Sequence, residues 1–460
     1  MVDTTGIKEE TGPSGQPALN RVIGPKLLLF FVVGDIIGTG VYALTGQVAG
    51  RVGGALWLPF LIAFVVAFMT AFSYLELVGK YPRAAGAALY TNRAFRIPIL
   101  TFMVAFAVMC SGITSASSAA VAFGNTYLAT FITSPMPLVA ILFIIGLAAI
   151  NFRGVSESVK TNVVLTCIEL SGLLIIIGVG VWAVLNGNGD ASRLTHIDTA
   201  DQTALVAISS ATSLAFFAMV GFEDSVNMAE ECRDPVRIFP KAMLWGMVIA
   251  SIIYVLVALT SSLLVPADEL AAAKSNALLK VLDVGAPGLP REIFSAIGLF
   301  AVINSALINM LMASRLLYGM ANERIIPKQL GIVHPFRRSP WVAILFTSVI
   351  AIILVSTVDI SVLGGTTALL LLVVFAIVNV AVLVLRREKV EHKHFRAPTI
   401  VPVFAALFCL YLVSPLSGRP ARDYQVAAIL LAAGLLLWGV NWFFMRASRE
   451  KEQESVGSSG

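Results

Sequence analysis

Charged residues are scarce in this chain. Only 13% of its 460 residues are Asp, Glu, Lys or Arg, whereas 58% are hydrophobic. A soluble domain carries about 25% charged residues, so this chain cannot cover a water-exposed surface of its size, but lipid can cover an apolar one. The composition therefore predicts a membrane-embedded protein.

Several chemical signatures are also missing. The four cysteines are scattered without a CxxC spacing, which argues against a disulfide or zinc framework. No Walker A motif suggests an ATP-driven step, and no HExxH or GxSxG motif indicates a hydrolase. The polar first residues contain no apolar signal-peptide core. We therefore expect no enzyme activity, no metal and no cofactor.

Long apolar blocks dominate the rest of the chain. A helix needs about 20 mostly apolar residues to span a membrane, and because lipid offers the backbone no hydrogen-bond partners, each span should be helical. The predicted fold is an all-α membrane protein with twelve transmembrane helices. The blocks lie at residues 26–49, 55–79, 98–130, 136–151, 162–185, 203–229, 240–265, 291–321, 341–357, 360–385, 398–414 and 424–445.

The distribution of basic residues predicts the orientation. With a cytoplasmic N-terminus, 25 of the 32 Lys and Arg residues fall in cytoplasmic segments and only seven on the other side. This follows the positive-inside rule and places both termini in the cytoplasm, in a cell membrane. Because the basic residues border a membrane face, we expect lipid around the protein and no nucleic-acid partner. Nothing in the sequence indicates an obligate protein partner.

The first span contains a cluster of glycines near its middle. It has the sequence LLLFFVVGDIIGTGVYALTGQV, with Gly34, Gly38 and Gly40 around Thr39. Glycine inside a helix costs about 1 kcal/mol relative to alanine, so this cluster favours local unwinding. Close helix packing through small residues is the alternative explanation.

The sixth span carries two adjacent acids. Gly221 precedes Glu223 and Asp224, and an Asp at the centre of a membrane helix costs about 2.5 to 3.5 kcal/mol. We therefore expect a break in this helix, with Asp224 or Glu223 facing a cavity or a partner. A position nearer the cytoplasmic edge is the alternative.

Breaks in spans one and six predict an internal repeat. A five-helix offset fits two inverted repeats of five helices, and paired discontinuous helices are typical of secondary transporters, which bind substrate between them. The predicted organisation is a tail at residues 1–24, repeats at 25–190 and 200–388, helices 11 and 12 at 396–446, and a tail at 447–460. Both tails are expected to be disordered and cytoplasmic.

Four ordered motifs carry a family resemblance. They are GDIIGTGVY in the first span, FFAMVGFEDSVNMAEECRDPVRIFPKAM in the sixth, YLELVGKYPRAAGAALY after the second and SRLLYGMANERIIPK after the eighth. The chain resembles the amino acid–polyamine–organocation (APC) family, which has the LeuT-type fold. The similarity covers residues 24–340 well and the remainder by span count.

The resemblance implies a substrate site at the two breaks. N–H groups at Thr39 and Gly40 would hold a substrate carboxylate, and carbonyls at Ile36, Phe217 and Val220 its amine. Phe217 or Phe222 would act as an aromatic gate. The complete set of expected substrate-binding residues is Ile36, Gly38, Thr39, Gly40, Phe217, Ala218, Val220, Gly221, Phe222 and Asp224.

Acids inside the spans suggest coupling to a cation. Asp35, Glu169 and Glu223 have no Lys or Arg at comparable depth. Several relatives carry a lysine where Glu169 aligns, so this chain departs from them. We hypothesise that Glu169 or Glu223 binds and releases a proton during transport, with Asp35 as a further cation contact. A purely structural role for Glu169 is the alternative, and the sequence does not choose between H⁺ and Na⁺.

Two groups of charges lie at the ends of spans. Glu76 is expected to form a cap or a salt bridge at the end of the second span. Glu231 belongs to a charged turn after the sixth span, which is either an inner gate with Arg83 or Arg93, or a solvated cluster.

The sequence thus predicts a secondary transporter that moves an amino acid by alternating access, coupled to protons or working by exchange. The excess of buried acids favours a cationic substrate. Transport of a polyamine or another organic amine is the alternative, and a non-transporting membrane sensor is a more distant one.

Overall fold

The computed structural model describes residues 21–83, 86–128, 131, 136–198, 202–323, 325–357 and 363–457. Every named element in these ranges is a helix, as the sequence predicted. Most of the tail predicted for residues 1–24 lies outside the described residues.

The first half of the chain forms long helices separated by short connections. The elements are α1 (Pro25–Ile36), α2 (Thr39–Val52), α3 (Trp57–Lys80), α4 (Gly86–Phe95), α5 (Pro98–Ala122), the π-helical turn η1 (Phe123–Tyr127), α6 (Met136–Arg153), α7 (Val155–Leu185) and the 3₁₀ helix η3 (Ala191–Thr195).

The second half has the same character. Its elements are α8 (Ala204–Ala218), the 3₁₀ helix η4 (Asp224–Glu231), α9 (Pro235–Leu264), α10 (Ala267–Ala273), η5 (Lys274–Asn276), α11 (Ala277–Gly285), α12 (Arg291–Asn322), η6 (Lys328–Gly331), α13 (Trp341–Thr357), α14 (Leu363–Leu385), α15 (Ile400–Val413), η8 (Pro415–Ser417) and α16 (Ala421–Gly457).

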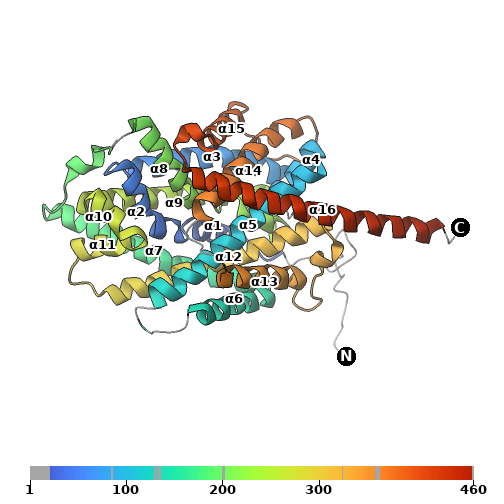
Figure 1. Ribbon diagram of the computed structural model, residues 1–460, viewed down its shortest axis with the longest axis horizontal. Coiled ribbons are helices and arrows are strands. Elements are labelled where there is room, and N and C mark those ends of the chain that lie inside the picture. The colour runs from blue at the N-terminus through green and yellow to red at the C-terminus, as the bar shows by residue number, and fades with distance from the viewer. Residues whose placement is uncertain are drawn as a thin grey trace.

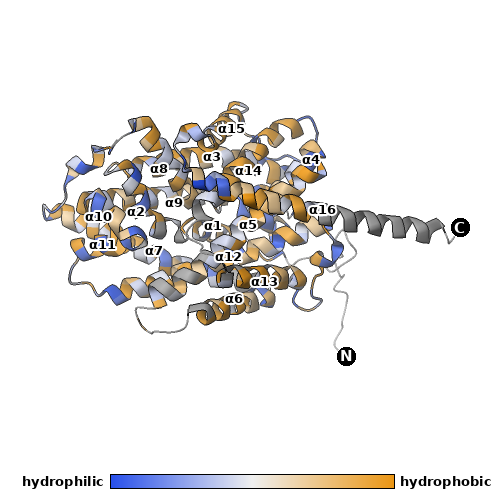
Figure 2. Ribbon diagram, viewed as in Figure 1, coloured by the Kyte–Doolittle hydropathy of each residue, from blue (hydrophilic) through white to orange (hydrophobic). Residues whose placement is uncertain are grey.

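Many of these helices suit a membrane. Within the described residues, eight helical stretches are long and apolar enough to cross one, and four shorter apolar helices accompany them. Each of the twelve predicted apolar blocks overlaps one of these stretches, although the count of twelve spans stays a prediction. Large apolar residues are also exposed on the outside of the bundle, and Leu142, Leu174, Trp245 and Leu407 are each more than half exposed. Lipid would cover such side chains, and hydrophobic residues recur along most of the helices of the bundle (Figure 2).

Helix α1 lies in the interior of the bundle (Figure 1). It packs against α7, α9 and α12, and its second half is buried on all sides, from Phe31 to Ile36. A helix that is apolar around its whole circumference is suited to such a position. Helices α10 and α11 lie at one end of the bundle and α4 at the other (Figure 1).

A buried ion pair joins α3 to the end of α14, near α4. The Glu76 carboxylate accepts hydrogen bonds from Arg386 Nε at 2.8 Å and Nη2 at 2.7 Å, and from the Ala397 N–H at 2.9 Å. Lys80 donates to the carbonyl oxygens of Leu385 and Glu388 in the same region. The predicted salt bridge of Glu76 is confirmed.

A second buried ion pair joins η4 to α12. Arg315 Nε lies 3.5 Å from Glu231 Oε1, and both side chains are almost completely buried. Neither interpretation of this turn holds at Glu231, which is buried rather than solvated. The gate with Arg83 or Arg93 is not formed, because Arg83 pairs with Glu323 at 3.0 Å and Arg93 lies over the Tyr81 ring. Arg315 is far from Glu231 in sequence, so local spacing could not identify it.

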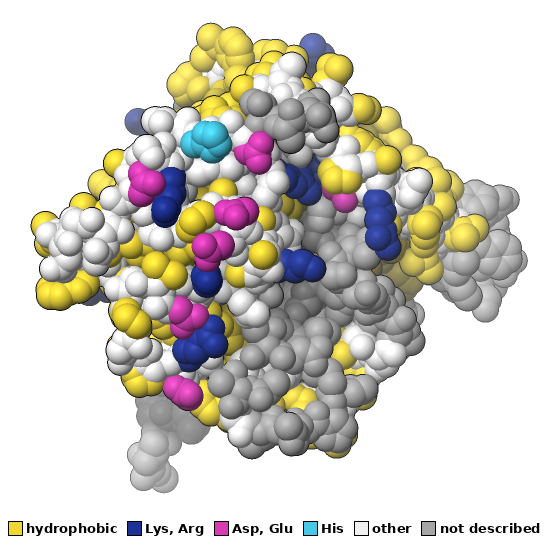
Figure 3. Space-filling model, turned by 60° about the vertical axis from the view of Figure 1, so that its left-hand side comes forward, with side chains coloured by type: hydrophobic (Ala, Val, Ile, Leu, Met, Phe, Trp, Pro, Cys, Tyr) yellow, Lys and Arg dark blue, Asp and Glu magenta, His cyan; other side chains and the backbone are white. Residues whose placement is uncertain are grey.

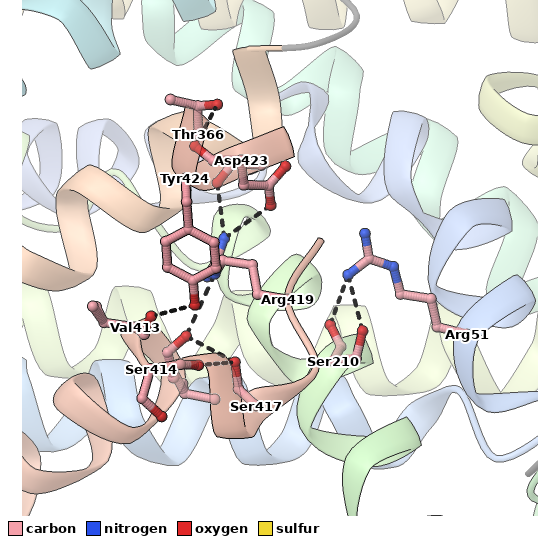
Figure 4. A network of polar contacts seen from close by, with 11 residues as sticks. Arg51, Ser210, Thr366, Val413, Ser414, Ser417, Arg419, Asp423 and Tyr424 are labelled. Atoms are coloured by element: carbon pink, nitrogen blue, oxygen red, sulfur yellow. Dashed lines mark hydrogen bonds and ion pairs between the residues drawn. The ribbon is translucent and has the colours of Figure 1, made fainter. Parts of the chain in front are cut away.

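Polar contacts also fasten the helices around the C-terminal end of α2 (Figure 4). Arg51 of α2 donates to the Ser210 carbonyl oxygen of α8 at 2.9 Å. Arg419 donates to the Gly365 carbonyl oxygen at 2.8 Å and lies 3.4 Å from Asp423 Oδ2. These contacts connect the start of α16 to the start of α14.

Acidic and basic side chains lie close together on the face that comes forward when the α10–α11 end is turned toward the viewer (Figure 3). Ion pairs at this end include Lys280 of α11 with Glu269 of α10 at 2.9 Å, and Arg291 at the start of α12 with Asp283 of α11 at 2.5 Å. Such exposed pairs each contribute about 0 to 1 kcal/mol, so they make this face polar and add little stability.

The end of the chain differs from the prediction. Residues from 447 were expected to form a disordered tail, but α16 is helical to Gly457 and extends past the rest of the bundle (Figure 1). The segment SREKEQE consists largely of Arg, Lys, Glu and Gln, which are strong helix formers. A long preceding helix removes the cost of nucleation, so the helix continues.

We predict that Glu76→Gln destabilises the protein by about 3 to 5 kcal/mol, because it leaves the buried Arg386 charge without its partner. Chemical unfolding in one detergent would measure the loss. Glu269→Gln is the matched control and should cost at most about 1 kcal/mol, since its pair with Lys280 is exposed. Equal losses in the two variants would contradict this assignment.

Candidate substrate site

The first span is broken at Ile37 and Gly38. Helix α1 ends at Ile36 and α2 begins at Thr39, so the predicted unwinding is confirmed. The alternative explanation, close helix packing through small residues, holds for the neighbouring Gly40. A Cβ atom on Gly40 would lie 2.7 Å from Ala218 Cα, so this glycine allows α2 to pack closely against α8.

The sixth span is broken over residues 219–223, between α8 and η4. Gly221 has a φ of +124°, a conformation that side-chain-bearing residues rarely adopt. A Cβ atom here would lie 2.9 Å from the Asp35 carbonyl carbon and 3.0 Å from its Cγ. The two breaks therefore touch, and glycine is required where they meet. Beyond this break the chain continues as a 3₁₀ helix.

A small cavity of about 40 Å³ lies between the breaks, which is room for a few water molecules. Eight of the ten predicted substrate-binding residues line it, and so does Asp35. The predicted residues in its wall are Ile36, Gly38, Gly40, Phe217, Ala218, Val220, Gly221 and Asp224.

Two predicted residues are not among those described in the cavity wall. Thr39 begins α2, but its side chain lies outside the described residues. Phe222 is fully buried and packs in an aromatic cluster, with ring centroids 5.8 Å from Tyr74 and 5.5 Å from Phe375. Phe217 is thus the better placed of the two predicted gate residues.

Three further polar residues lie in the cavity wall. They are Ser115 of α5 and Ser305 and Asn309 of α12. Asn309 Nδ2 donates to the Ser305 carbonyl oxygen at 2.8 Å. Residues four apart share one helix face, so the spacing of Ser305 and Asn309 is a signal that could have found both.

The wall of the cavity contains acidic side chains. Asp35 and Asp224 lie in its wall, and no Lys or Arg is among its described lining residues. Asp35 Oδ2 has no hydrogen-bond partner in the described part of the chain, and Asp35 lies close enough to Asp224 and Glu223 for their charges to repel. Such a cluster is stable only if it binds protons or a cation.

Comparison with known families decides the identity. A family model described as amino acid permease matches residues 23–440. The chain belongs to the amino acid permease family. It is therefore a multi-pass membrane transporter, as the motifs of the first and sixth spans indicated.

Named relatives of this permease differ in substrate. It is 24% identical to a branched-chain amino acid permease of Bacillus subtilis, over 87% of this chain and 89% of the relative. It is 26% identical to the methylthioribose transporter of the same organism, over 92% and 94%. A low-affinity putrescine importer of Escherichia coli is 25% identical over 70% and 73%.

Backbone carbonyls at the breaks of the permease already have protein partners. The Tyr254 hydroxyl donates to the Ile36 carbonyl oxygen, and the Val220 N–H donates to the Phe217 carbonyl oxygen at 3.3 Å. A carbonyl oxygen has two lone pairs, so each can accept a second bond from a substrate. Tyr254, which lies on α9, was not foreseen from the sequence.

The predicted coupling residues of the permease occupy different places. Glu223 lies beside the cavity, where its Oε2 accepts the Gly221 N–H at 2.9 Å. Glu169 of α7 is completely buried and is not among the described residues of the cavity wall. Its Oε2 accepts from Asn304 Nδ2 at 3.1 Å, and its Oε1 has no partner among the described residues.

We predict that Gly221→Ala abolishes specific substrate binding by the permease, because the new Cβ would push Asp35 away from the cavity. Equilibrium binding of a labelled substrate to the purified protein would measure the effect. Gly178→Ala on α7 is the matched control, since nothing described lies within 4 Å of its added Cβ. Normal binding by the Gly221 variant would show that the meeting point of the breaks is not the site.

Proposed function

We propose that this chain is a secondary active transporter that moves an amino acid across the plasma membrane by alternating access, with both termini in the cytoplasm. The observation that carries the proposal is the contact between two broken helices around a cavity in the bundle interior. Broken helix pairs form the substrate sites of many secondary transporters.

The chemistry of the breaks suits a zwitterion. The first N–H groups of α2, at Thr39 and Gly40, have no acceptor within their own helix, and a helix N-terminus attracts a carboxylate. The carbonyl oxygens of Ile36, Phe217 and Val220 belong to residues of the same cavity wall and suit an ammonium group. An amino acid presents both charges at the required short separation.

The acids favour a substrate with additional positive charge. Asp35 and Asp224 give the cavity two carboxyl groups without a basic side chain among the described lining residues to neutralise them. A cationic amino acid would place its side-chain charge against one of them. A polyamine is the second candidate, supported by the same acids and by the 25% identity to a putrescine importer.

The small volume of the cavity supports alternating access. About 40 Å³ is too little for an amino acid with its side chain, so the helices around the breaks must separate to admit one. Closure around the bound substrate would then exclude water, and opening toward the other side would release it.

Protons are the proposed coupling ion. Glu169 is buried with one oxygen that has no partner among the described residues, and Glu223 repels the nearby acids of the cavity. Uptake of a proton by either group removes a charge that the low-dielectric interior disfavours. The proton would bind on the outer side and leave on the cytoplasmic side, moving with the substrate.

We predict that proteoliposomes containing the protein accumulate labelled lysine or putrescine by counterflow, and that both compete better than alanine or glutamate. Asp224→Asn should weaken lysine and putrescine competition by about tenfold or more, because a hydrogen bond to a charged group contributes about 1.5 to 3 kcal/mol. Asp283→Asn, at an exposed surface pair, is the control and should change nothing. Preference for glutamate would refute a cation-selective site, and binding without flux would indicate a sensor.

We further predict that an inward proton gradient accelerates uptake by the native protein and no longer does so in Glu169→Gln or in Glu223→Gln. The variant that carries the coupling role should retain exchange of internal for external substrate, since exchange needs no net proton movement. Glu292→Gln, on the exposed first turn of α12, is the control. Proton coupling through these residues is ruled out if both variants respond to the gradient like the native protein.

A further inference from the structure

A polar cluster lies on the side of α1 that faces α7 and α12. It consists of Asn162, Thr166 and Glu169 of α7 and Asn304 of α12, all buried. Gly34 of α1 packs directly onto it, because a Cβ atom on Gly34 would lie 2.0 Å from Thr166 Oγ1. Any change in this cluster therefore affects the last turn of α1, immediately before the break.

Asn304 has more acceptors than it can satisfy. Its Nδ2 lies 3.1 Å from Glu169 Oε2, 3.1 Å from Thr166 Oγ1 and 3.4 Å from the Gly34 carbonyl oxygen. An amide NH₂ group carries only two N–H donors. The three acceptors therefore compete. On its other side the amide Oδ1 accepts from Asn162 Nδ2 at 2.7 Å, so the NH₂ end is the one that faces these acceptors.

The Gly34 carbonyl needs this donor. The last four carbonyl groups of a helix lack partners within it, and α1 ends two residues after Gly34. The Val33 carbonyl oxygen accepts from the Ile37 N–H at 2.9 Å. The Gly34 carbonyl oxygen accepts instead from the Asn304 side-chain amide, so this side chain caps the broken end of α1.

No basic group neutralises Glu169 among its described neighbours. The titratable groups that face it are the hydroxyls of Tyr42 on α2, Tyr127 on η1 and Tyr254 on α9. Tyr42 donates to the Glu169 backbone carbonyl oxygen at 3.1 Å rather than to its carboxyl group. Glu169 Oε1 has no partner within the described ranges, which leaves it available to a proton.

We propose that Asn304 is the positioning residue that links the proton on Glu169 to the broken end of α1. An ionised Glu169 forms the stronger, charge-assisted bond and draws the amide away from Gly34. A protonated Glu169 is a weaker acceptor and releases the amide to cap α1. Loss of the proton thus loosens α1 where it borders the substrate cavity. This inference rests on the proposed proton-binding role of Glu169.

Hydrogen–deuterium exchange of the full-length protein in lipid nanodiscs tests this link without a substrate. Native protein and Glu169→Gln are compared at the same pH, so that the intrinsic exchange rate cancels. At alkaline pH the segment 25–38 should exchange about fivefold or more faster in the native protein, at the lower limit expected for linked sites. At acidic pH the two should agree, because residue 169 is then neutral in both.

The same comparison is then repeated without the linking amide, between Asn304→Ala alone and Asn304→Ala combined with Glu169→Gln. These two proteins should exchange at the same rate at every pH. Asn304→Ser, which keeps one donor, should retain part of the difference and serves if the alanine variant does not fold. Asn379→Ala is the matched control. It removes a buried amide that bonds Ser73 and Thr70 at 2.6 and 3.1 Å, and should leave the difference intact.

The possible results separate the two proposals. If the difference persists without Asn304, the link through this residue is wrong, whereas proton-driven uptake can still depend on Glu169. If the exchange of native protein and Glu169→Gln never differs, Glu169 does not act on α1 and the inference fails. If the difference requires Asn304 but uptake ignores a proton gradient, the link stands and the proposed proton coupling fails.

Discussion

The structure depends on one constraint, which is that backbone polar groups in a membrane interior must find partners within the protein. The first and sixth spans both interrupt their helical hydrogen bonding at the same place. The protein can tolerate this only where the freed backbone N–H and C=O groups meet polar neighbours. The two breaks lie against each other, because the chain at Gly221 approaches Asp35 within contact distance. Tyr254 and Asn304 bond carbonyl groups at the broken end of α1. A site for a small charged molecule follows from the same arrangement.

The second determining feature is the excess of buried acids over buried bases near the breaks. Away from the breaks, two buried acids are paired with arginines, Glu231 with Arg315 and Glu76 with Arg386. These pairs fasten helices together at positions away from the cavity. Asp35, Asp224 and Glu169 have no such partner among the residues described around them, and we propose that the substrate and a coupling proton balance their charge.

The sequence was sufficient to predict the features that depend on residues close together in the chain. Glycines beside Thr39 and the Gly221–Asp224 segment identified both breaks, and apolar length identified the helices. Features that join distant segments were beyond it. Three such contacts are the ion pair of Glu231 with Arg315 and the hydrogen bonds of Ile36 with Tyr254 and of Glu169 with Asn304. The two residues of each pair lie on different helices, so helix periodicity gives no signal for the pairing. The helical end of α16 was missed for another reason, since a charge-rich composition suits both a disordered tail and an extension of an existing helix.

The central claim is that the contact between the two breaks is where the transported molecule binds, and an experimental structure determined with saturating lysine or putrescine tests it most directly. We predict density for the ligand between residues 36–40 and 217–224, with its ammonium group near Asp35 or Asp224 and an enlarged cavity around it. Ligand density elsewhere in the bundle, or continuous helices through Gly38 and Gly221, would contradict the account.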